Sequence, residues 1–313
     1  METRYPFRLI DGERRGPLED PSLLLERPFL SVDTSFAADA QRFVSGEDLE
    51  QAMNTALAVG EPLLLTGEPG VGKTQAAYYM AWKLGVEPVI HFQVKSDSTA
   101  LDLLYHFDTI RYFHDAHRTS PGELDLSKEK YIEQRSLWEA MDSDRPRVLL
   151  IDEIDKAPRD FPNDLLYELD KMEFQVKETG KIIRSPRELR PIVVITSNSE
   201  RRLPEPFLRR CVYHHIRFED GLVRKAVVAR RDEFAALSEG FLKLSLERFL
   251  ALRQRNLRKL PATGELLVWL RVLALAVGSY PEELAEDLSQ LPYLGLLLKD
   301  HQDIESLGER KEQ

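Results

Sequence analysis

Cysteine is almost absent from this sequence, since Cys211 is the only one among 313 residues. It cannot form an internal disulfide, which suits a reducing intracellular compartment. Basic residues are also in deficit, 43 against 53 acidic ones, and the formal charge of −10 argues against general adhesion to nucleic acid or anionic membrane. Long apolar runs are lacking: the longest, residues 266–277, is interrupted by Arg271. The N-terminus has no apolar secretory signal core, so we expect a cytoplasmic protein with protein partners.

Internal repeats and low-complexity tracts are missing too, which excludes repeat architectures. What remains is 42% hydrophobic and 31% charged residues, a balance that does not fit a disordered chain. Short continuous apolar runs alternate with segments of helical spacing, and this pattern predicts a three-layer αβα core with a parallel sheet. The expected strands are residues 62–66, 88–93, 147–152 and 191–196, with a hairpin at 173–184.

A chain of this length exceeds what one core usually supports, so a second, smaller domain is expected. Beyond about residue 221 the strand pattern ends, and the sequence predicts an all-helical domain. The expected parts are an N-terminal arm or tail (1–30), the large αβα domain (31–220), the helical domain (221–302) and a frayed tail (303–313). Helices are expected at 97–115, 223–237, 246–255, 264–277 and 281–291, and the polar segment 120–135 is an insertion or a plain loop.

A glycine-rich loop follows the first predicted strand and precedes a helix. It consists of Gly67, Glu68, Pro69, Gly70, Val71, Gly72, Lys73 and Thr74. Glycines let backbone N–H groups turn toward phosphate oxygens, and the helix adds its positive dipole end. Lys73 is expected to reach the β- and γ-phosphates, and Thr74 to bind Mg²⁺. The alternative is an ordinary glycine turn, but the buried strand in front of it favours an ATP site.

Two carboxylates end another predicted buried strand. Asp152 is expected to hold Mg²⁺ through water, and Glu153 to polarise the attacking water. A surface acidic pair that caps a helix is the alternative. Asn198 ends the next strand and is expected to orient the same water, unless it only closes the strand by turn chemistry. Arg209 and Arg210 end a short helix beyond it, where one of them suits a cation donated to a neighbouring subunit; a solvated arginine pair is the alternative.

The order and wording of these motifs resemble the MoxR branch of the AAA+ ATPases over about residues 36–277. The motifs are the glycine loop, Asp152-Glu-Ile-Asp-Lys-Ala-Pro158, the hairpin, Thr196-Ser-Asn198 and Leu203-Pro-Glu-Pro-Phe-Leu-Arg-Arg210. The resemblance implies that Asn198 is sensor 1, that Arg209 or Arg210 is the arginine finger, and that the hairpin is the insertion before sensor 1. It also implies a hexameric ring with a helical lid that remodels or activates a partner protein, in many relatives one with a von Willebrand factor A domain.

One position departs from this family: Thr263 stands where a sensor 2 arginine is usual. A nucleotide-gated switch or assembly scaffold with slow turnover is therefore an alternative to a fast ATPase. A nucleic-acid motor is disfavoured by the acidic balance, and the basic run 253–259 fits a charged helix face. A GTPase is less expected because no Asn-Lys-x-Asp sequence occurs. The clustered histidines 106, 114 and 117 and the pair 214–215 lack a metal-binding spacing and are interpreted as structural.

Overall fold

The structure, a computed structural model, describes residues 9–10, 20–26, 28, 30, 35–118, 127–198, 200–278, 280 and 284–308. These residues divide into two compact units, which are treated separately below. One unit is residues 39–217. The other combines residues 218–313 with residues 1–38, so that residues 35–38, expected in the large domain, belong to the helical unit. Most of the expected N-terminal arm lies outside the described residues, which include a 3-10 helix at Pro21–Glu26.

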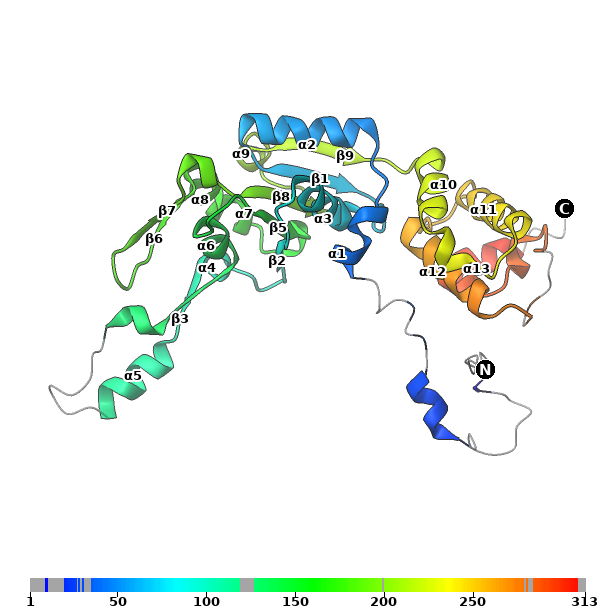
Figure 1. The fold of residues 1–313 in the computed structure, drawn as a ribbon, viewed down its shortest axis with the longest axis horizontal. Helices are drawn as coiled ribbons and strands as arrows, with labels where there is room; N and C mark the ends of the chain where they lie inside the picture. Colours follow the sequence, from blue (N-terminus) through cyan, green and yellow to red (C-terminus); the bar gives the residue numbers. More distant parts are fainter. Residues whose placement is uncertain are drawn as a thin grey trace. The chain divides into compact units, whose positions relative to one another are not determined.

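A parallel sheet of five strands, in the order β2-β5-β8-β1-β9, forms the centre of the first unit (Figure 1). Its strands are β1 (Leu63–Gly67), β2 (Ile90–Gln93), β5 (Val148–Asp152), β8 (Ile192–Ser197) and β9 (Val212–Ile216). Every residue of β1 and β5 is buried, as expected for strands covered on both faces. The apolar runs therefore predicted four of the five strands correctly, namely β1, β2, β5 and β8.

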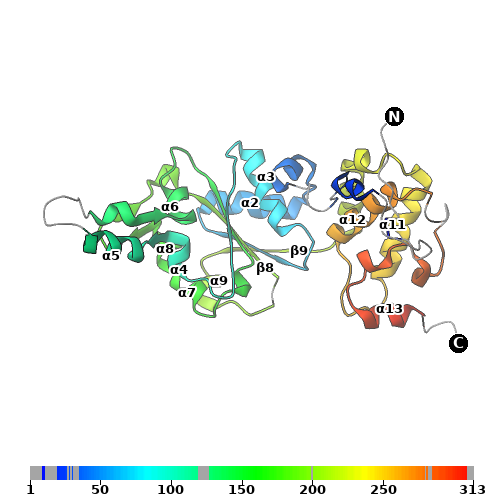
Figure 2. The same ribbon diagram turned by 90° about the horizontal axis from the view of Figure 1, so that it is seen from below.

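Alternate residues of β1 enter different cores, which shows that helices cover both faces of the sheet. Leu63 and Leu65 pack with α2 (Glu47–Val59) and α3 (Lys73–Leu84). Leu64 packs on the opposite face with a second group of helices (Figure 2). These are α4 (Ala100–Leu104), α6 (Ser136–Met141), α7 (Phe161–Asp164), α8 (Leu166–Lys171) and α9 (Glu205–Leu208). The predicted three-layer αβα architecture is confirmed.

The helix expected at 97–115 is wrong. After α4 the chain forms β3 (Tyr105–Phe107), then α5 (Thr109–Arg118), a 3-10 turn and β4 (Ile132–Gln134), which pairs antiparallel with β3. Figure 1 shows this insertion projecting away from the central sheet. It begins at residue 105, well before the insertion expected at 120–135, and residues 119–126 lie outside the described ranges.

The predicted hairpin consists of β6 (Glu173–Gln175) and β7 (Ile182–Arg184), paired antiparallel. Its base is joined to the insertion by aromatic contacts. The ring of Tyr105 stacks on Phe174 with centroids 6.2 Å apart, and Trp138 meets Phe174 edge-on at 5.5 Å. Aromatic pairs of this geometry add stability beyond the area that they bury. The bases of the two projecting segments therefore contact each other and Trp138 of α6.

The second unit is helical and has its own core around the fully buried side chains of Phe234, Phe249 and Trp269. Its helices are α10 (Asp220–Ala229), α11 (Glu239–Arg253), α12 (Thr263–Leu275) and α13 (His301–Gly308). The helix expected at 281–291 is wrong for residues 284–291, which contain only a 3-10 turn, Leu288–Gln290. The frayed tail expected from residue 303 is also wrong up to residue 308, because α13 is formed there and Asp303 is buried.

Smaller elements complete the described chain: α1 (Phe36–Asp39) and the 3-10 turns Ala40–Arg42, Lys128–Tyr131, Ile154–Lys156, Arg187–Leu189, Arg231–Phe234 and Leu294–Leu296. Across the described ranges, the helices are too short or too polar for any of them to span a bilayer.

Candidate functional site

The glycine-rich loop connects the end of β1 to the start of α3. Gly67, Gly70 and Gly72 have φ values of 147°, 79° and 97°, which side chains other than glycine rarely adopt. Space is short as well: a Cβ on Gly67 would lie 2.6 Å from the carbonyl oxygen of Ile216, and one on Gly72 would lie 2.9 Å from the ring of Phe43. The loop thus requires glycine at these positions, and it precedes a helix N-terminus whose first N–H groups have no helical partners.

Lys73 is folded into this loop. Its side chain is buried, and Nζ donates hydrogen bonds to the carbonyl oxygens of Gly67 and Glu68, both at 2.9 Å. Burial lowers the pKa of Lys73, although the carboxylates of Asp155 and Asp152 oppose this shift. A cation enclosed by a glycine loop at a helix N-terminus is the arrangement that binds the phosphates of a nucleotide.

Asp152 ends β5 beside the first turn of α3. The hydroxyl of Thr74 lies 3.0 Å from Oδ1 and 3.2 Å from Oδ2 of Asp152. Thr196 in β8 donates a further hydrogen bond to Oδ1 at 2.5 Å. Burial raises the pKa of Asp152, but hydrogen bonds from His91, Thr196 and Thr74 outweigh it and hold the pKa below its usual value. An ionised carboxylate next to a threonine hydroxyl is a set of oxygen donors that fits Mg²⁺.

Glu153 follows with a left-handed backbone, at a φ of 60°. Its N–H donates to the hydroxyl of Thr196 at 2.8 Å, so Thr196 contacts both acidic residues. Its carboxylate accepts hydrogen bonds from Asn198 Nδ2 at 3.2 Å and from Gln93 Nε2 at 2.8 Å, and it pairs with Lys156. The candidate general base is therefore held by three side chains from three different segments.

Asn198 lies next to Glu153 because β8 ends beside β1 and β5. Its backbone N–H donates to Asp155 Oδ1 at 3.2 Å, and the N–H of Glu200 donates to Oδ2 of the same carboxylate at 3.0 Å. Asp155 is buried and thus fixes the chain that follows β8. The structure brings together five of the predicted residues here: Lys73, Thr74, Asp152, Glu153 and Asn198.

Sequence reasoning missed several polar residues of this site. His91 and Gln93 belong to β2, Thr196 belongs to β8, and Lys156 lies one turn beyond Glu153. The strands themselves were predicted, and their polar residues near the carboxyl ends were a usable signal because carboxyl ends of parallel strands meet at one edge. The pairing of β2 with β5, which places Gln93 opposite Asp152, was not predictable from either segment alone.

Arg209 and Arg210 are exposed and lie away from this edge. They lie just before β9, whose first residue, Val212, pairs with Leu63 at the start of β1, whereas the glycine loop begins at Gly67, the last residue of β1. A strand rises about 3.3 Å per residue, so the length of β1 from Leu63 to Gly67 separates the arginines from the loop by roughly 13 Å along the sheet. Arg210 donates a hydrogen bond to the carbonyl oxygen of Pro206 at 3.0 Å. Within one chain, the arginines are not part of the carboxylate cluster.

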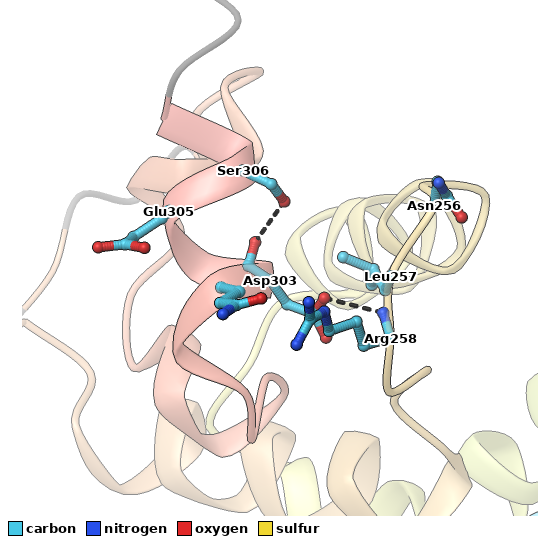
Figure 3. A pocket seen from close by; sticks show the side chains of 7 residues that line it. Asn256, Leu257, Arg258, Asp303, Glu305 and Ser306 are labelled. Atoms are coloured by element: carbon cyan, nitrogen blue, oxygen red, sulfur yellow. Dashed lines mark hydrogen bonds between the residues drawn. The ribbon is translucent and has the colours of Figure 1, made fainter.

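Two hollows of the described chain lie apart from the five clustered residues. In the helical unit, a polar groove of about 410 Å³ lies between α13 and the chain after α11 (Figure 3). There Asp303 accepts hydrogen bonds from the N–H groups of Arg258 and Lys259 at 2.8 and 3.0 Å. A smaller cavity of about 190 Å³ is lined by Arg210 and Cys211, among others. The histidines do not join Cys, Asp or Glu in any metal-binding group of three within the described residues.

Comparison with known proteins agrees with the geometry of the loop and the two acidic residues. Residues 62–211, from β1 to the start of β9, match the family AAA domain (dynein-related subfamily). Over this segment, the chain is similar to that AAA family. The match confirms the resemblance to MoxR-like AAA+ ATPases that the motifs indicated.

Relatives of this AAA domain are similar over limited stretches or at low identity. Protein CbbQ from Hydrogenophilus thermoluteolus is 40% identical over 62 residues, which are 20% of this chain and 22% of that protein. The matched part thus spans about a fifth of this curated relative. A solved structure of a candidate ATPase from Cytophaga hutchinsonii ATCC 33406 is 16% identical, with a TM-score of 0.40 over 87% of this chain and 92% of that chain.

Proposed function

We propose that this protein is a Mg²⁺-dependent ATPase that works as a ring and remodels or activates a partner protein. The observation that carries the proposal is the cluster at the carboxyl edge of the sheet. There the hydroxyl of Thr74 contacts Asp152, the amide of Asn198 contacts Glu153, and Lys73 is enclosed by the glycine loop. A phosphate-binding loop and a pair of carboxylates with separate partners are the parts that phosphoryl transfer to water requires.

Each residue has a role that follows from its position. The glycine loop and Lys73 bind the phosphates, while Thr74 and Asp152 would hold Mg²⁺, which neutralises charge on the β- and γ-phosphate oxygens when bound. Glu153 accepts a proton from the attacking water, and Asn198 orients that water through its amide. The carboxylate of Glu153 already contacts Gln93, Lys156 and Asn198, so the attacking water must reach a lone pair that these partners do not occupy.

A ring assembly is proposed because the predicted finger arginines lie away from the carboxylate cluster of their own chain. Arg209 and Arg210 lie at the opposite end of β1 from the glycine loop, so they suit the site of a neighbouring copy and not their own. By resemblance to the MoxR branch, we propose a hexamer in the cytoplasm. By the same resemblance, the partner is a protein with a von Willebrand factor A domain.

A second candidate is a nucleotide-gated switch with slow turnover. Two observations favour it: the carboxylate of Glu153 is held by three donors, and Thr263 occupies the first turn of α12 where the family usually has an arginine. These three partners hold the carboxylate in place and occupy lone pairs that could otherwise accept from the attacking water. In this alternative, nucleotide binding and not turnover changes the state of the protein.

Hydrolysis is tested by Glu153→Gln, with Glu139→Gln as a matched control at an exposed position of α6. Loss of a general base typically lowers the rate about a hundredfold to ten-thousandfold, so Glu153→Gln should hydrolyse ATP at least about 100 times more slowly. Both variants should bind ATP like the wild type. Equal rates for wild type and Glu153→Gln would rule out the ATPase mechanism, and slow but equal rates with intact ATP binding would support the switch.

Action between subunits is tested by mixing two inactive variants, Glu153→Gln and Arg210→Ala. A site formed by Glu153 of the second variant and Arg210 of the first is complete, and random mixing at equal amounts gives about a quarter of such sites in a closed ring. The mixture should therefore regain activity that neither variant has alone. No gain after verified subunit exchange would show that Arg210 does not act across a subunit boundary; the same experiment with Arg209→Ala identifies which arginine does.

A further inference from the structure

Two residues beside Asp152 have no role in the function proposed above. His91, in β2, places Nε2 3.2 Å from Oδ2 of Asp152. Its other ring nitrogen, Nδ1, lies 3.2 Å from the hydroxyl of Tyr78 in α3. The side chain of His91 is 25% exposed and that of Asp152 is 7% exposed, so this contact is largely shielded from water. The three side chains form a chain of hydrogen bonds that ends on a candidate Mg²⁺ ligand.

The acceptor character of Asp152 determines the direction of these hydrogen bonds. An ionised carboxylate can only accept, so Nε2 of His91 carries the hydrogen and donates it to Oδ2. In a neutral imidazole, Nδ1 is then the acceptor, and the hydroxyl of Tyr78 donates to it. Tyr78 thereby selects the tautomer of His91 that can donate to Asp152.

The hydrogen bonds begin and end on α3, the helix that follows the glycine loop. Thr74 and Tyr78 are four residues apart on one face of α3, and both point toward the β2–β5 pair. Thr74 contacts Asp152, Asp152 contacts His91, and His91 contacts Tyr78. The same helix thus holds the carboxylate directly through one hydroxyl and indirectly through the other.

The two oxygens of Asp152 are held unequally. Oδ1 accepts hydrogen bonds from Thr196 at 2.5 Å and Thr74 at 3.0 Å. Oδ2 is 3.2 Å from the same Thr74 hydroxyl, which also bonds Oδ1, and 3.2 Å from His91. Among the described residues, His91 is therefore the donor to Oδ2 that does not also bond Oδ1. Its removal would let the carboxylate turn about the Cβ–Cγ bond of Asp152.

We propose that His91, oriented by Tyr78, is a positioning residue that fixes the carboxylate of Asp152 for Mg²⁺ bound with ATP. The inference rests on the proposed function, because it assumes that Asp152 serves a metal. A purely structural role for His91 is not needed to hold β2 in place. Backbone pairing from Ile90 with Leu149 to Gln93 with Asp152 already fixes the register of the two strands.

The test uses the full chain and measures metal binding apart from turnover. The variants are His91→Leu, which removes the donor, His91→Gln, which keeps an N–H donor, and Tyr78→Phe. His106→Leu is the control, since His106 is an exposed histidine in a strand of the insertion. Mn²⁺ affinity in the presence of ADP is measured by electron paramagnetic resonance, and ADP affinity with EDTA reports nucleotide binding without metal.

Loss of a residue that supports a metal ligand typically weakens metal binding about 10- to 100-fold. We expect His91→Leu to weaken Mn²⁺ about 10-fold, because Asp152 keeps two other donors. His91→Gln should recover most of this loss, Tyr78→Phe should lose less than His91→Leu, and His106→Leu should match the wild type. ADP affinity in EDTA should stay unchanged in all four variants, and each variant should still unfold cooperatively in urea.

Several results would overturn the inference. A folded His91→Leu variant with wild-type Mn²⁺ affinity would show that Asp152 does not need this donor. Equal losses in His91→Leu and His91→Gln would show that the hydrogen bond is not the cause. A wild-type protein that binds ADP without any Mn²⁺ enhancement would remove the metal site itself, and one that binds no ADP would contradict the proposed function as well.

Discussion

Replacement of Thr196 by valine tests whether one buried hydroxyl holds both acidic residues of the site. Thr196 is fully buried, and its hydroxyl donates to Asp152 Oδ1 and accepts the backbone N–H of Glu153. Valine keeps the shape but leaves that N–H unpaired, at a cost of about 1–3 kcal/mol, and removes a hydrogen bond to a charged group worth about 1.5–3 kcal/mol. Since the two effects overlap, we expect Thr196→Val to lower the free energy of unfolding by about 2–4 kcal/mol.

The same substitution should slow ATP hydrolysis beyond its effect on stability. A left-handed backbone costs a residue with a side chain roughly 1–2 kcal/mol, and Glu153 adopts it while its N–H is bonded to Thr196. Without that bond, the backbone of Glu153 can relax and move the base. Urea unfolding and steady-state ATPase assays measure the two effects, with Thr196→Ser as the control that keeps the hydroxyl. If the free energies of unfolding of the valine and serine variants agree within about 0.5 kcal/mol, the hydroxyl does not stabilise the two acidic residues as proposed.

Three further predictions use other features of the first unit. Gly67→Ala should lower stability by about 1–3 kcal/mol or more and abolish ATP binding, because its Cβ would meet the carbonyl of Ile216; Gly60→Ala, where nothing lies within 4 Å, should cost only about 1 kcal/mol in urea unfolding. Burial raises the pKa of Cys211 to about 12, so about one thiol in ten thousand is ionised at pH 8, and Ellman's reagent should react rapidly only after unfolding. Folding lowers the pKa of Asp152, so the ionised carboxylate stabilises the folded protein. This stabilisation is complete above the unfolded-state pKa of about 3.9 and is lost as the pH falls through the lower folded-state pKa. The difference in unfolding free energy between wild type and Asp152→Asn should therefore shrink below about pH 4.

The central sheet could be predicted from sequence because strands buried on both faces read as unbroken apolar runs. The segment 97–115 could not, because Leu101, Leu104 and Tyr105 have helical spacing although the helix ends at Leu104. The reason lies outside the segment: the ring of Tyr105 packs on Phe174, nearly seventy residues further along the chain. Local periodicity carries no information about such a contact.

The candidate site divides in the same way. The residues of the glycine loop follow one another in sequence, and so do Asp152 and Glu153. Each short motif therefore indicated its chemistry by its own residue spacing. His91 and Thr196 lie about 60 and 44 residues from Asp152 and reach it only through the strand order β2-β5-β8. Predicting them would have required the order of the strands and their register, and neither is encoded in a short motif.

The carboxylate of Asp303 has a practical consequence for work with this protein. Charge and position suggest that the last eleven residues are dispensable, yet Asp303 anchors the N–H groups of Arg258 and Lys259, in the connection that leads into α12. A chain that ends at residue 302 would leave both N–H groups without this acceptor. Each one that stays buried and unpaired would lower the free energy of unfolding by about 1–3 kcal/mol. Affinity tags should therefore be placed beyond residue 308, and truncations made to aid crystallisation should stop after α13.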